Sequence, residues 1–406
     1  MVKHIIIIGK NFLTTLGAVR SLAKSEFILN VVYVSSNKED IEILAASKYI
    51  DTLVVVKERD EAKVIETLLN RFDIKKNKYM LFPTDDFSAS CIDKFSVELK
   101  DLFLMQYVVG DSVLRMMDKS IQSKLARDAG LTTAEEWIVS LDSDIIEIPQ
   151  AILYPCFVKP LLSAKGGKAG LYKCDTKEEL IEKLNIMQSQ MRNRSVLIQE
   201  YLNIIDEYTM GGVCNDQEVY IPAIIKKKTV AKSNRGVTLC GKMISEDEIK
   251  ESMPAIIQFL KSVRFIGMFD LEVMATDKGL YFGELNLRCG GPSYSYNVCG
   301  VNLNEITVQI ISEGRKPEKN MQIMQDKVFI NDKVAWEDYS NLYLSRKELN
   351  ALYKECDFAL ISDEVDTEPE KVFYKKKVPI YKMKRRKKTI KKLLHPFVKI
   401  IRGGEK

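Results

Sequence analysis

Two short stretches decide the fold: residues 267–274, Gly-Met-Phe-Asp-Leu-Glu-Val-Met, and residues 281–288, Tyr-Phe-Gly-Glu-Leu-Asn-Leu-Arg. Each alternates apolar and polar side chains, which is the period of a β-strand with two different faces. The link between them, residues 275–280, contains Asp-Lys-Gly, a combination that favours a hairpin turn. The sequence therefore predicts two adjacent antiparallel strands.

Acidic and amide side chains recur on one face of this predicted hairpin. Glu272 on the first strand and Glu284 and Asn286 on the second would converge, a set of three oxygen donors suited to Mg²⁺. Arg288 would lie beside them, where it could stabilise developing negative charge. The alternative is the solvated polar face of an ordinary hairpin. Apolar flanks on both strands disfavour it, since buried carboxylates without partners are costly.

A second motif is a strand that ends in a lysine and leads into a loop of small residues. The strand is Phe157–Pro160, with Lys159 near its end, and residues 161–171 follow as Leu-Leu-Ser-Ala-Lys-Gly-Gly-Lys-Ala-Gly-Leu. Glycines let backbone amides approach phosphate oxygens, and lysines supply positive charge. The order of residues is not that of a GxxxxGK[ST] P-loop, which disfavours a Walker-type NTPase. An ordinary flexible turn remains the alternative.

A third motif, Val196–Leu202, is an apolar strand that runs into Glu200-Tyr201-Leu202. This end could offer a carboxylate and backbone groups to an adenine edge, and Glu207 could accept hydrogen bonds from ribose hydroxyls. Taken singly, each glutamate could equally be a surface residue. The loop Cys289–Ser293, directly after the hairpin, could hold a carboxylate or acyl phosphate with its amides, or be a simple turn.

Residues 1 to about 112 alternate short apolar runs with helix-like stretches, the pattern of an α/β unit with a parallel sheet. Strands are expected at His4–Ile8, Asn30–Val34, Thr52–Val56 and Tyr79–Phe82. Gly9 stands alone, so the Rossmann G-x-G-x-x-G is absent and a dinucleotide site is disfavoured. Pro83–Asp86 follows a strand, where such sheets bind ligands, although a helix N-cap by Thr84 or Asp85 explains it equally well.

Further along, residues 113–130 predict one helix that ends at Gly130. Residues 310–370 look folded without a motif that we can assign, and Phe358–Ile361 is expected to be a strand.

The composition narrows the chemistry. The chain has 406 residues, 46% of them apolar, and only two histidines, His4 and His395. Zinc sites of the HExxH type are therefore excluded, and Ser-His-Asp or Cys-His catalysis is disfavoured. Carboxylates, lysines, arginines and backbone amides remain, which are the groups that bind a metal-nucleotide.

The cysteines and the start of the chain predict a cytoplasmic protein. Eight cysteines occur without a CxxC pair, which we interpret as reduced thiols. The first residues lead into a strand without the cleavage site of a signal peptide, and no apolar run is long enough to span a membrane.

The last 32 residues carry an unusual charge. Residues 375–406 contain 14 Lys and Arg and one acid, a charge of +13, so that the first 374 residues carry 5 − 13 = −8. The tail is either a disordered solubilising extension or a basic amphipathic helix. The second form suits the inner face of an anionic membrane, through residues 375–402. Pro396 is expected to interrupt that helix. The 384–388 cluster lacks the alternating aromatics that stack RNA bases, so no specific nucleic-acid partner is expected.

In this order and spacing, the motifs resemble the ATP-grasp superfamily of carboxylate–amine ligases over roughly residues 113–310. The preceding α/β unit is similar to the pre-ATP-grasp domain. The resemblance implies an α/β and α+β protein, in which an N-terminal parallel-sheet domain precedes a two-subdomain ATP-grasp fold. The implied boundaries are 1–112, 113–312 with a lid at about 150–205, 313–374 as an extension packed on the ATP-grasp domain, and 375–406 as the basic tail.

The resemblance also implies roles for single residues. Lys119 and Lys159 would contact nucleotide phosphates under a mobile loop that includes Ser163, Lys165, Gly166, Gly167, Lys168 and Gly170, a version richer in lysine than usual. Around the nucleoside, Glu200, Tyr201 and Leu202 would hold adenine, Met274 would pack beneath it, and Glu207 would bind the ribose. Glu272, Glu284 and Asn286 would bind Mg²⁺ or Mn²⁺. Arg288 and Lys159 would be the catalytic residues, and Arg288 would stabilise the acyl phosphate.

The implied reaction is ATP-dependent ligation of a small carboxylate to an amine through an acyl phosphate, with release of ADP. Within the superfamily the chain looks most similar to amino-acid and peptide ligases, including the D-aspartate ligase-like group, which suggests a cell-envelope precursor as acceptor and a homodimer as assembly. Two alternatives stay open: carboxylation through carboxyphosphate, as in biotin-dependent carboxylases, and a non-catalytic nucleotide-binding scaffold recruited to a membrane by its tail.

Overall fold

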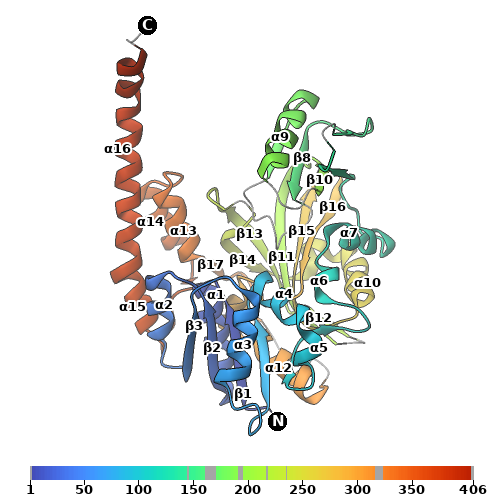
Figure 1. The fold of residues 1–406 in the computed structure, drawn as a ribbon, viewed down its shortest axis with the longest axis vertical. Helices are drawn as coiled ribbons and strands as arrows, with labels where there is room; N and C mark the ends of the chain where they lie inside the picture. The colour runs from blue at the N-terminus through green and yellow to red at the C-terminus, as the bar shows by residue number, and fades with distance from the viewer. Residues whose placement is uncertain are drawn as a thin grey trace.

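The computed structural model describes residues 2–143, 146–160, 171–190, 195–215, 218–234, 236–315 and 323–403. Figure 1 shows a parallel sheet near the N-terminus, a large sheet behind and above it, a small sheet at the top, and a long C-terminal helix at one side. The α/β and α+β class predicted from the sequence is confirmed.

The N-terminal sheet is wholly parallel, with strand order β3-β2-β1-β4-β5. Its strands are β1 His4–Gly9, β2 Ile28–Val34, β3 Thr52–Val56, β4 Tyr79–Pro83 and β5 Phe103–Leu104. Its helices are α1 Phe12–Leu22, η1 Ala23–Ser25, α2 Lys38–Ala45, α3 Glu61–Arg71, α4 Asp86–Lys94 and α5 Ser96–Leu99. The four isoleucines of β1 are fully buried, as expected of a strand covered on both faces.

The predicted single helix over residues 113–130 is wrong in one respect: the chain breaks it into α6 Val113–Met116 and α7 Lys119–Asp128. The side chain of Asp118 accepts hydrogen bonds from the amides of Ser120 and Ile121. Aspartate is a strong N-cap because it satisfies the free amides of a first turn, and so it starts a new helix here.

The large sheet carries the predicted hairpin. Its order is β16-β15-β11-β13-β14-β17-β18, with β12 paired to β11 and β6 to β15. The strands are β6 Tyr107–Val108, β11 Ile204–Cys214, β12 Val219–Tyr220, β13 Ile224–Val230, β14 Thr238–Ile244, β15 Phe265–Thr276, β16 Gly279–Asn286, β17 Val328–Ile330 and β18 Phe358–Ala359. The accompanying helices are η2 Glu246–Ser252, α10 Met253–Val263, α11 Ser293–Val298 and α12 Leu303–Glu313.

The β15–β16 hairpin is confirmed and is tighter than predicted. The strands continue to Thr276 and from Gly279, which leaves Asp277 and Lys278 as the turn. Gly279 has φ of +117°, a conformation that favours glycine. A bulge places one extra residue, Gly283, between the pairs Glu272–Glu284 and Val273–Phe282.

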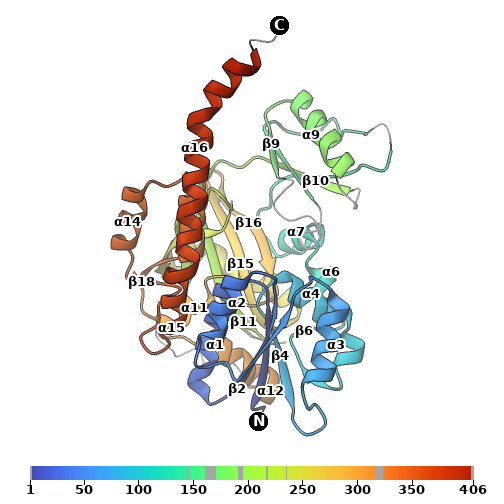
Figure 2. The same ribbon diagram turned by 60° about the vertical axis from the view of Figure 1, so that its left-hand side comes forward.

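The small sheet has the order β7-β10-β8-β9 and is antiparallel throughout. It comprises β7 Glu136–Ser140, β8 Cys156–Pro160, β9 Tyr172–Cys174 and β10 Ser195–Glu200, and α9 Lys177–Gln190 packs on it. The sheet includes β7, which lies before the lid segment of about 150–205 expected from the sequence. Figure 2 shows that the small sheet and α9 stand above the large sheet from this side as well.

The segment after α12 contacts the large sheet and the N-terminal domain. β17 adds to the large sheet beside β14, and β18 pairs with β17 but is shorter than the strand predicted over Phe358–Ile361. Towards the N-terminal domain, Arg20 of α1 forms an ion pair with Asp366 at 3.1 Å, and both side chains are 1% exposed. Asp366 also accepts from the hydroxyl of Ser47 at 2.8 Å and the amide of Lys48 at 3.0 Å.

The C-terminal helices are α13 Asp332–Ser340, α14 Arg346–Glu355, α15 Glu368–Val372, the π-helix η3 Phe373–Lys377, and α16 Val378–Gly403. The prediction that Pro396 interrupts the tail helix is wrong, because α16 continues through that position. A proline removes one backbone hydrogen bond, and the turns on either side can keep a helix going. Of the helices in the described residues, none combines the length and hydropathy that a membrane crossing needs.

Candidate active site

The predicted oxygen donors meet on the β15–β16 hairpin. Glu272 lies directly opposite Glu284, and Asp270 directly opposite Asn286. Asn286 is 7% exposed and lies on the same face of β16 as Glu284, two residues away.

The donor set fits a divalent cation that arrives with further ligands. Two carboxylates and one amide oxygen are the hard ligands that Mg²⁺ takes, and Mg²⁺ is usually bound by one or two carboxylates plus substrate phosphates. In the stretches that the structure describes, no group of three or more His, Cys, Asp or Glu side chains is close enough to hold a metal alone.

Lys119 binds one of these carboxylates. It is the first residue of α7, and its Nζ lies 2.7 Å from Glu284 Oε1. Burial alone would raise the pKa of Glu284, but Lys119, with Lys159 and Arg288, lowers it to about 2. Glu284 is therefore ionised at any physiological pH.

Lys159 approaches the same place from the small sheet. Its Nζ donates to Gln199 Oε1 at 2.7 Å, and Gln199 Nε2 donates to Glu136 Oε1 at 2.7 Å. Burial, with repulsion from Lys119, lowers the pKa of Lys159 to about 8. Two lysines thus face the carboxylates, as an anionic polyphosphate would require.

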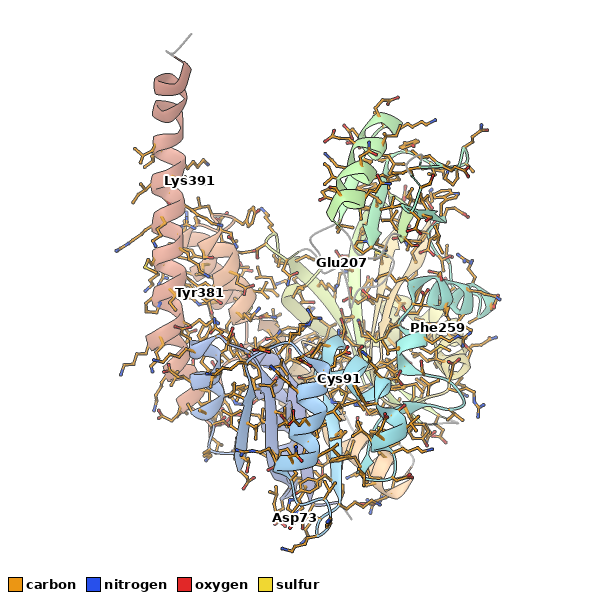
Figure 3. All side chains as sticks on the ribbon, in the orientation of Figure 1. Asp73, Cys91, Glu207, Phe259, Tyr381 and Lys391 are labelled. Carbon is orange, nitrogen blue, oxygen red and sulfur yellow. The ribbon has the colours of Figure 1, made fainter. Side chains whose placement is uncertain are left out.

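Lys227, on β13, was missed as a site residue, since the sequence shows only a run of three lysines at 226–228. Its Nζ donates to Glu272 Oε2 at 2.9 Å, to Glu207 Oε2 at 3.1 Å and to the carbonyl of Gly236 at 2.9 Å. The period of the strand does not separate Lys227 from Lys226, because Ile224 and Ile225 are both fully buried. The predicted ribose and metal glutamates are thereby joined through one ammonium group, and Figure 3 labels Glu207 between the small and parallel sheets.

Arg288 connects the hairpin to the N-terminal domain. Its Nε lies 2.8 Å from Asp86 Oδ1, and its Nη1 lies 3.6 Å from Asp270 Oδ2. Burial raises the pKa of Asp270 to about 6 despite this guanidinium. Asp86 belongs to the Pro83–Asp86 motif that the sequence marked as a possible ligand-binding position, whereas Asp270 was not predicted as a site residue.

The Pro83–Asp86 motif therefore serves two purposes. Asp85 caps α4 in a reciprocal capping box with Ser88, as the N-cap alternative held, and it also accepts from the amide of Lys10 at 2.7 Å. Asp86 instead reaches Arg288 from the carboxyl end of the parallel sheet. This is the edge where sheets of this kind bind ligands.

The predicted adenine residues are only partly brought together. Leu202 is buried in a small cluster with Ala134 and Tyr281, and Met274 packs against it, as a base-binding wall would. Glu200 pairs with Lys278 of the hairpin turn at 3.1 Å. The amide of Tyr201 already donates to the carbonyl of Pro155, so this N–H is not available to a base.

Six predicted residues, and with them the predicted glycine loop, fall outside the described residues: Ser163, Lys165, Gly166, Gly167, Lys168 and Gly170. The loop Cys289–Ser293 forms a turn, closed by a hydrogen bond from the amide of Ser293 to the carbonyl of Gly290. A Cβ at Gly290 would lie 2.6 Å from Asp270 Cγ, so glycine is needed there for packing.

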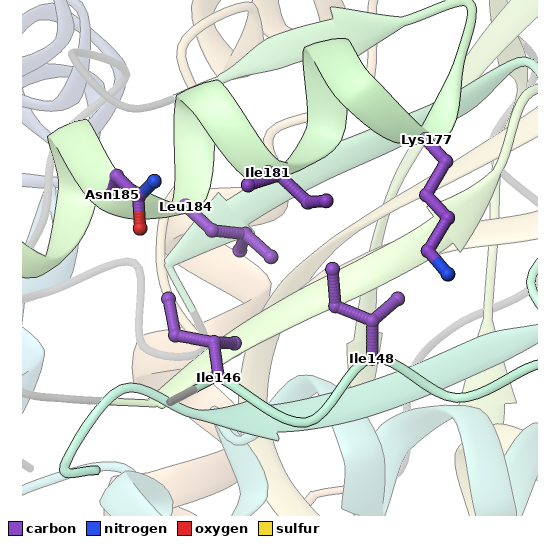
Figure 4. Close-up of a pocket in the computed structure, with 6 residues that line it drawn as sticks. All are labelled: Ile146, Ile148, Lys177, Ile181, Leu184 and Asn185. Atoms are coloured by element: carbon purple, nitrogen blue, oxygen red, sulfur yellow. The ribbon is translucent and has the colours of Figure 1, made fainter. Parts of the chain in front are cut away.

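A separate cavity of about 290 Å³ lies in the small subdomain, and none of the predicted site residues lines it. Figure 4 shows it between the segment 146–148 and α9, with apolar side chains on both walls. Its lining residues are Ile146, Ile148, Lys177, Ile181, Leu184 and Asn185.

Comparison with known proteins gives curated relatives but no matching family model. The chain is 27% identical over 239 residues to a D-alanine–D-alanine ligase of Geobacillus thermodenitrificans, which covers 52% of this chain and 64% of that enzyme. It is 24% identical over 182 residues to a formate-dependent phosphoribosylglycinamide formyltransferase of Prochlorococcus marinus, which covers 44% and 45%. The chain thus spans less than two thirds of the length of these relatives.

Solved structures share the fold over most of the chain. Biotin carboxylase from Campylobacter jejuni superposes with a TM-score of 0.63 at 16% identity, covering 81% of this chain and 75% of the other. N5-carboxyaminoimidazole synthetase from Staphylococcus aureus gives 0.60 at 15% identity and 86% coverage of both. An L-amino acid ligase from Bacillus licheniformis gives 0.55 at 14% identity, covering 80% and 78%.

Proposed function

We propose, from the premise that the chain belongs to the ATP-grasp superfamily, that it is an ADP-forming ligase that joins a carboxylate to an amine. The observation that carries the proposal is the cross-strand pairing of Glu272 with Glu284, with Asn286 two residues further along the same strand, faced by Lys119 and Lys159. Such a site combines the hard oxygen ligands of a metal with the positive charge that a triphosphate requires.

The roles follow from the contacts. Lys119 and Lys159 would bind the phosphates, Glu207 the ribose, and Leu202 with Met274 the base. Mg²⁺, or Mn²⁺ in its place, would be held by Glu272, Glu284 and Asn286 and would supply charge neutralisation at the phosphates when bound. Little covalent work is left to the protein in phosphoryl transfer, so positioning and electrostatics would account for most of the rate.

Arg288 is placed to act in the second half of the reaction, the attack of the amine on the acyl phosphate. In our proposal the substrate carboxylate becomes an acyl phosphate, an amine attacks its carbonyl carbon, and phosphate leaves. Arg288 would stabilise the negative charge on that carbonyl oxygen. Its ion pair with Asp86 supports this, because it brings the guanidinium to the ligand-binding edge of the parallel sheet.

The substrates are proposed as small molecules, with an amino acid or related acid as the carboxylate. The D-alanine–D-alanine ligase among the relatives and the L-amino acid ligase among the structures support an amino acid. We further propose a cytoplasmic enzyme, assembled as a homodimer, whose segment 375–402 rests on the inner face of an anionic membrane. An envelope precursor would then be a fitting acceptor.

A release assay for inorganic phosphate, run with pairs of carboxylates and amines, tests the reaction. We expect ADP and phosphate only when both substrates are present, and loss of turnover by at least about a thousandfold in Glu284→Gln, since that change removes a metal ligand and a charge. Asp277→Asn is the matched control, an exposed acid in the turn of the same hairpin, and should retain activity. Phosphate release that needs bicarbonate but no amine would support carboxylation instead, and full activity of Glu284→Gln would refute the metal assignment.

A further inference from the structure

Each of the two carboxylates proposed to bind the metal already accepts a hydrogen bond from a lysine ammonium group. Glu272 accepts from Lys227 at 2.9 Å and Glu284 accepts from Lys119 at 2.7 Å, and the two glutamates are direct cross-strand neighbours. A divalent cation placed between these carboxylates would lie close to both ammonium groups. Repulsion between like charges at such short range is strong when the site is partly shielded from water.

Lys227 is fixed more firmly than a surface lysine. Its side chain is 1% exposed, and its three ammonium protons have three acceptors, on Glu207, Glu272 and the backbone of Gly236. Lys227 forms ion pairs with both glutamates, so it cannot leave without uncovering two partly buried carboxylates.

Lys119 is held differently. Its side chain is 13% exposed and lies on the side of Glu284 from which Lys159 also approaches. Phosphate oxygens would offer both lysines new acceptors and add negative charge to the site. The carboxylate of Glu284 would then be released for another cation, whereas Lys227 would stay between its two glutamates.

We propose that Lys227 and Lys119 are built-in counter-ions that keep a divalent cation from binding until a nucleoside polyphosphate is present. This inference rests on the proposed function and deepens it. It states that the metal binds together with the nucleotide and not to the nucleotide-free protein. Lys227 is a positioning residue in this scheme: it holds the ribose glutamate and a metal glutamate as one unit.

The test measures the binding of Mn²⁺ to the full-length protein. Electron paramagnetic resonance monitors this binding, because the signal of the free ion decreases as the ion is bound. In the unaltered protein, we expect the affinity for Mn²⁺ to be at least about a hundredfold weaker without nucleotide than with saturating ADP. Lys227→Met should strengthen binding to the nucleotide-free protein by about tenfold or more, because it removes one positive charge beside Glu272.

Lys226→Met is the matched control. Lys226 is the neighbouring residue on the same strand and carries the same charge, but it pairs with Asp206 and Glu248 instead. Its loss should leave the affinity for Mn²⁺ unchanged within about twofold. Lys119→Met, at a more exposed position, provides a second variant and should also strengthen nucleotide-free binding, even if Lys227→Met fails to fold.

The outcomes are distinguishable. Equal affinities of the nucleotide-free and ADP-bound protein for Mn²⁺ would overturn the inference, and so would an unchanged affinity in both Lys119→Met and a folded Lys227→Met. Those results leave the proposed ligase intact. Failure of the protein to bind ADP with Mn²⁺ at all would instead overturn the proposed function and the inference with it.

Discussion

Lys159, like Asp270, has a pKa that burial has moved towards neutral pH. Its pKa of about 8 means that it is mostly charged at pH 7 and mostly neutral at pH 9. A phosphate prefers the charged form, so nucleotide binding should take up a proton as the pH rises through this range. The affinity for ADP should therefore fall by up to about tenfold between pH 7 and pH 9.

This prediction can be checked by calorimetric titration of ADP at both pH values. Lys159→Arg keeps its charge throughout the range, so its affinity should not change with pH. Lys159→Met should bind weakly and also without pH dependence. If the affinity of Lys159→Arg for ADP changed with pH as much as that of the unaltered protein, a group other than Lys159 would be responsible for the pH dependence.

Two ion pairs that the sequence did not predict join residues that are far apart along the chain. Lys227 is 45 residues from Glu272, and Arg288 is 202 residues from Asp86. Periodicity and turn chemistry report neighbours within a strand or hairpin, which is why Glu272, Glu284 and Asn286 could be predicted. Ion pairs between separate elements depend on how those elements pack, and a single sequence carries no direct signal of that packing.

At the scale of elements, the break between α6 and α7 positions Lys119. A continuous helix over residues 113–130 would have carried this lysine in its interior, whereas the cap at Asp118 makes it the first residue of a new helix. Apolar periodicity is the same on both sides of the break, which is why the sequence suggested one helix. The capping residue itself was the signal that could have revealed two.

We expect Asp118→Ala to lower the free energy of unfolding by about 1 kcal/mol, since it leaves two amides of α7 without their acceptor. The affinity for ADP should fall as well, because the first turn carries Lys119. Chemical denaturation and calorimetry measure the two effects. Asp118→Asn keeps an equally good cap and should behave as the unaltered protein does; a loss as large as that of Asp118→Ala would assign the effect to charge instead of capping.

At the scale of the whole molecule, α16 presents two different faces. Near its start, Tyr381 is buried, and the Arg385 guanidinium donates to the carbonyls of Tyr339 and Leu344. At 100° per residue, Met383, Ile390 and Leu394 lie on the opposite face, and they are 50%, 56% and 53% exposed. Lysines flank this apolar stripe on a helix that projects from the body, where Figure 3 labels Lys391.

This arrangement predicts binding to vesicles that contain anionic lipid, weakening as salt is added. The double substitution Ile390→Ser with Leu394→Ser should reduce binding by about a hundredfold or more, because each of the two side chains contributes roughly 1.5–3 kcal/mol when fully inserted. Co-sedimentation with vesicles measures it, and Val97→Ser, an exposed apolar residue on α5, is the control. Equal binding to purely zwitterionic vesicles would contradict an electrostatic contact, and concentration-dependent dimers without lipid binding would assign the stripe to a second copy.

The buried contact of Arg20 with Asp366 joins the first helix of the chain to a segment near its end, 346 residues later. This buried ion pair therefore links an early and a late part of the sequence. Replacing one of these two parts alone would leave a buried charge without its partner. A chimera that takes its first hundred residues from a protein without an arginine at the position of Arg20 would leave Asp366 in the interior without its guanidinium partner.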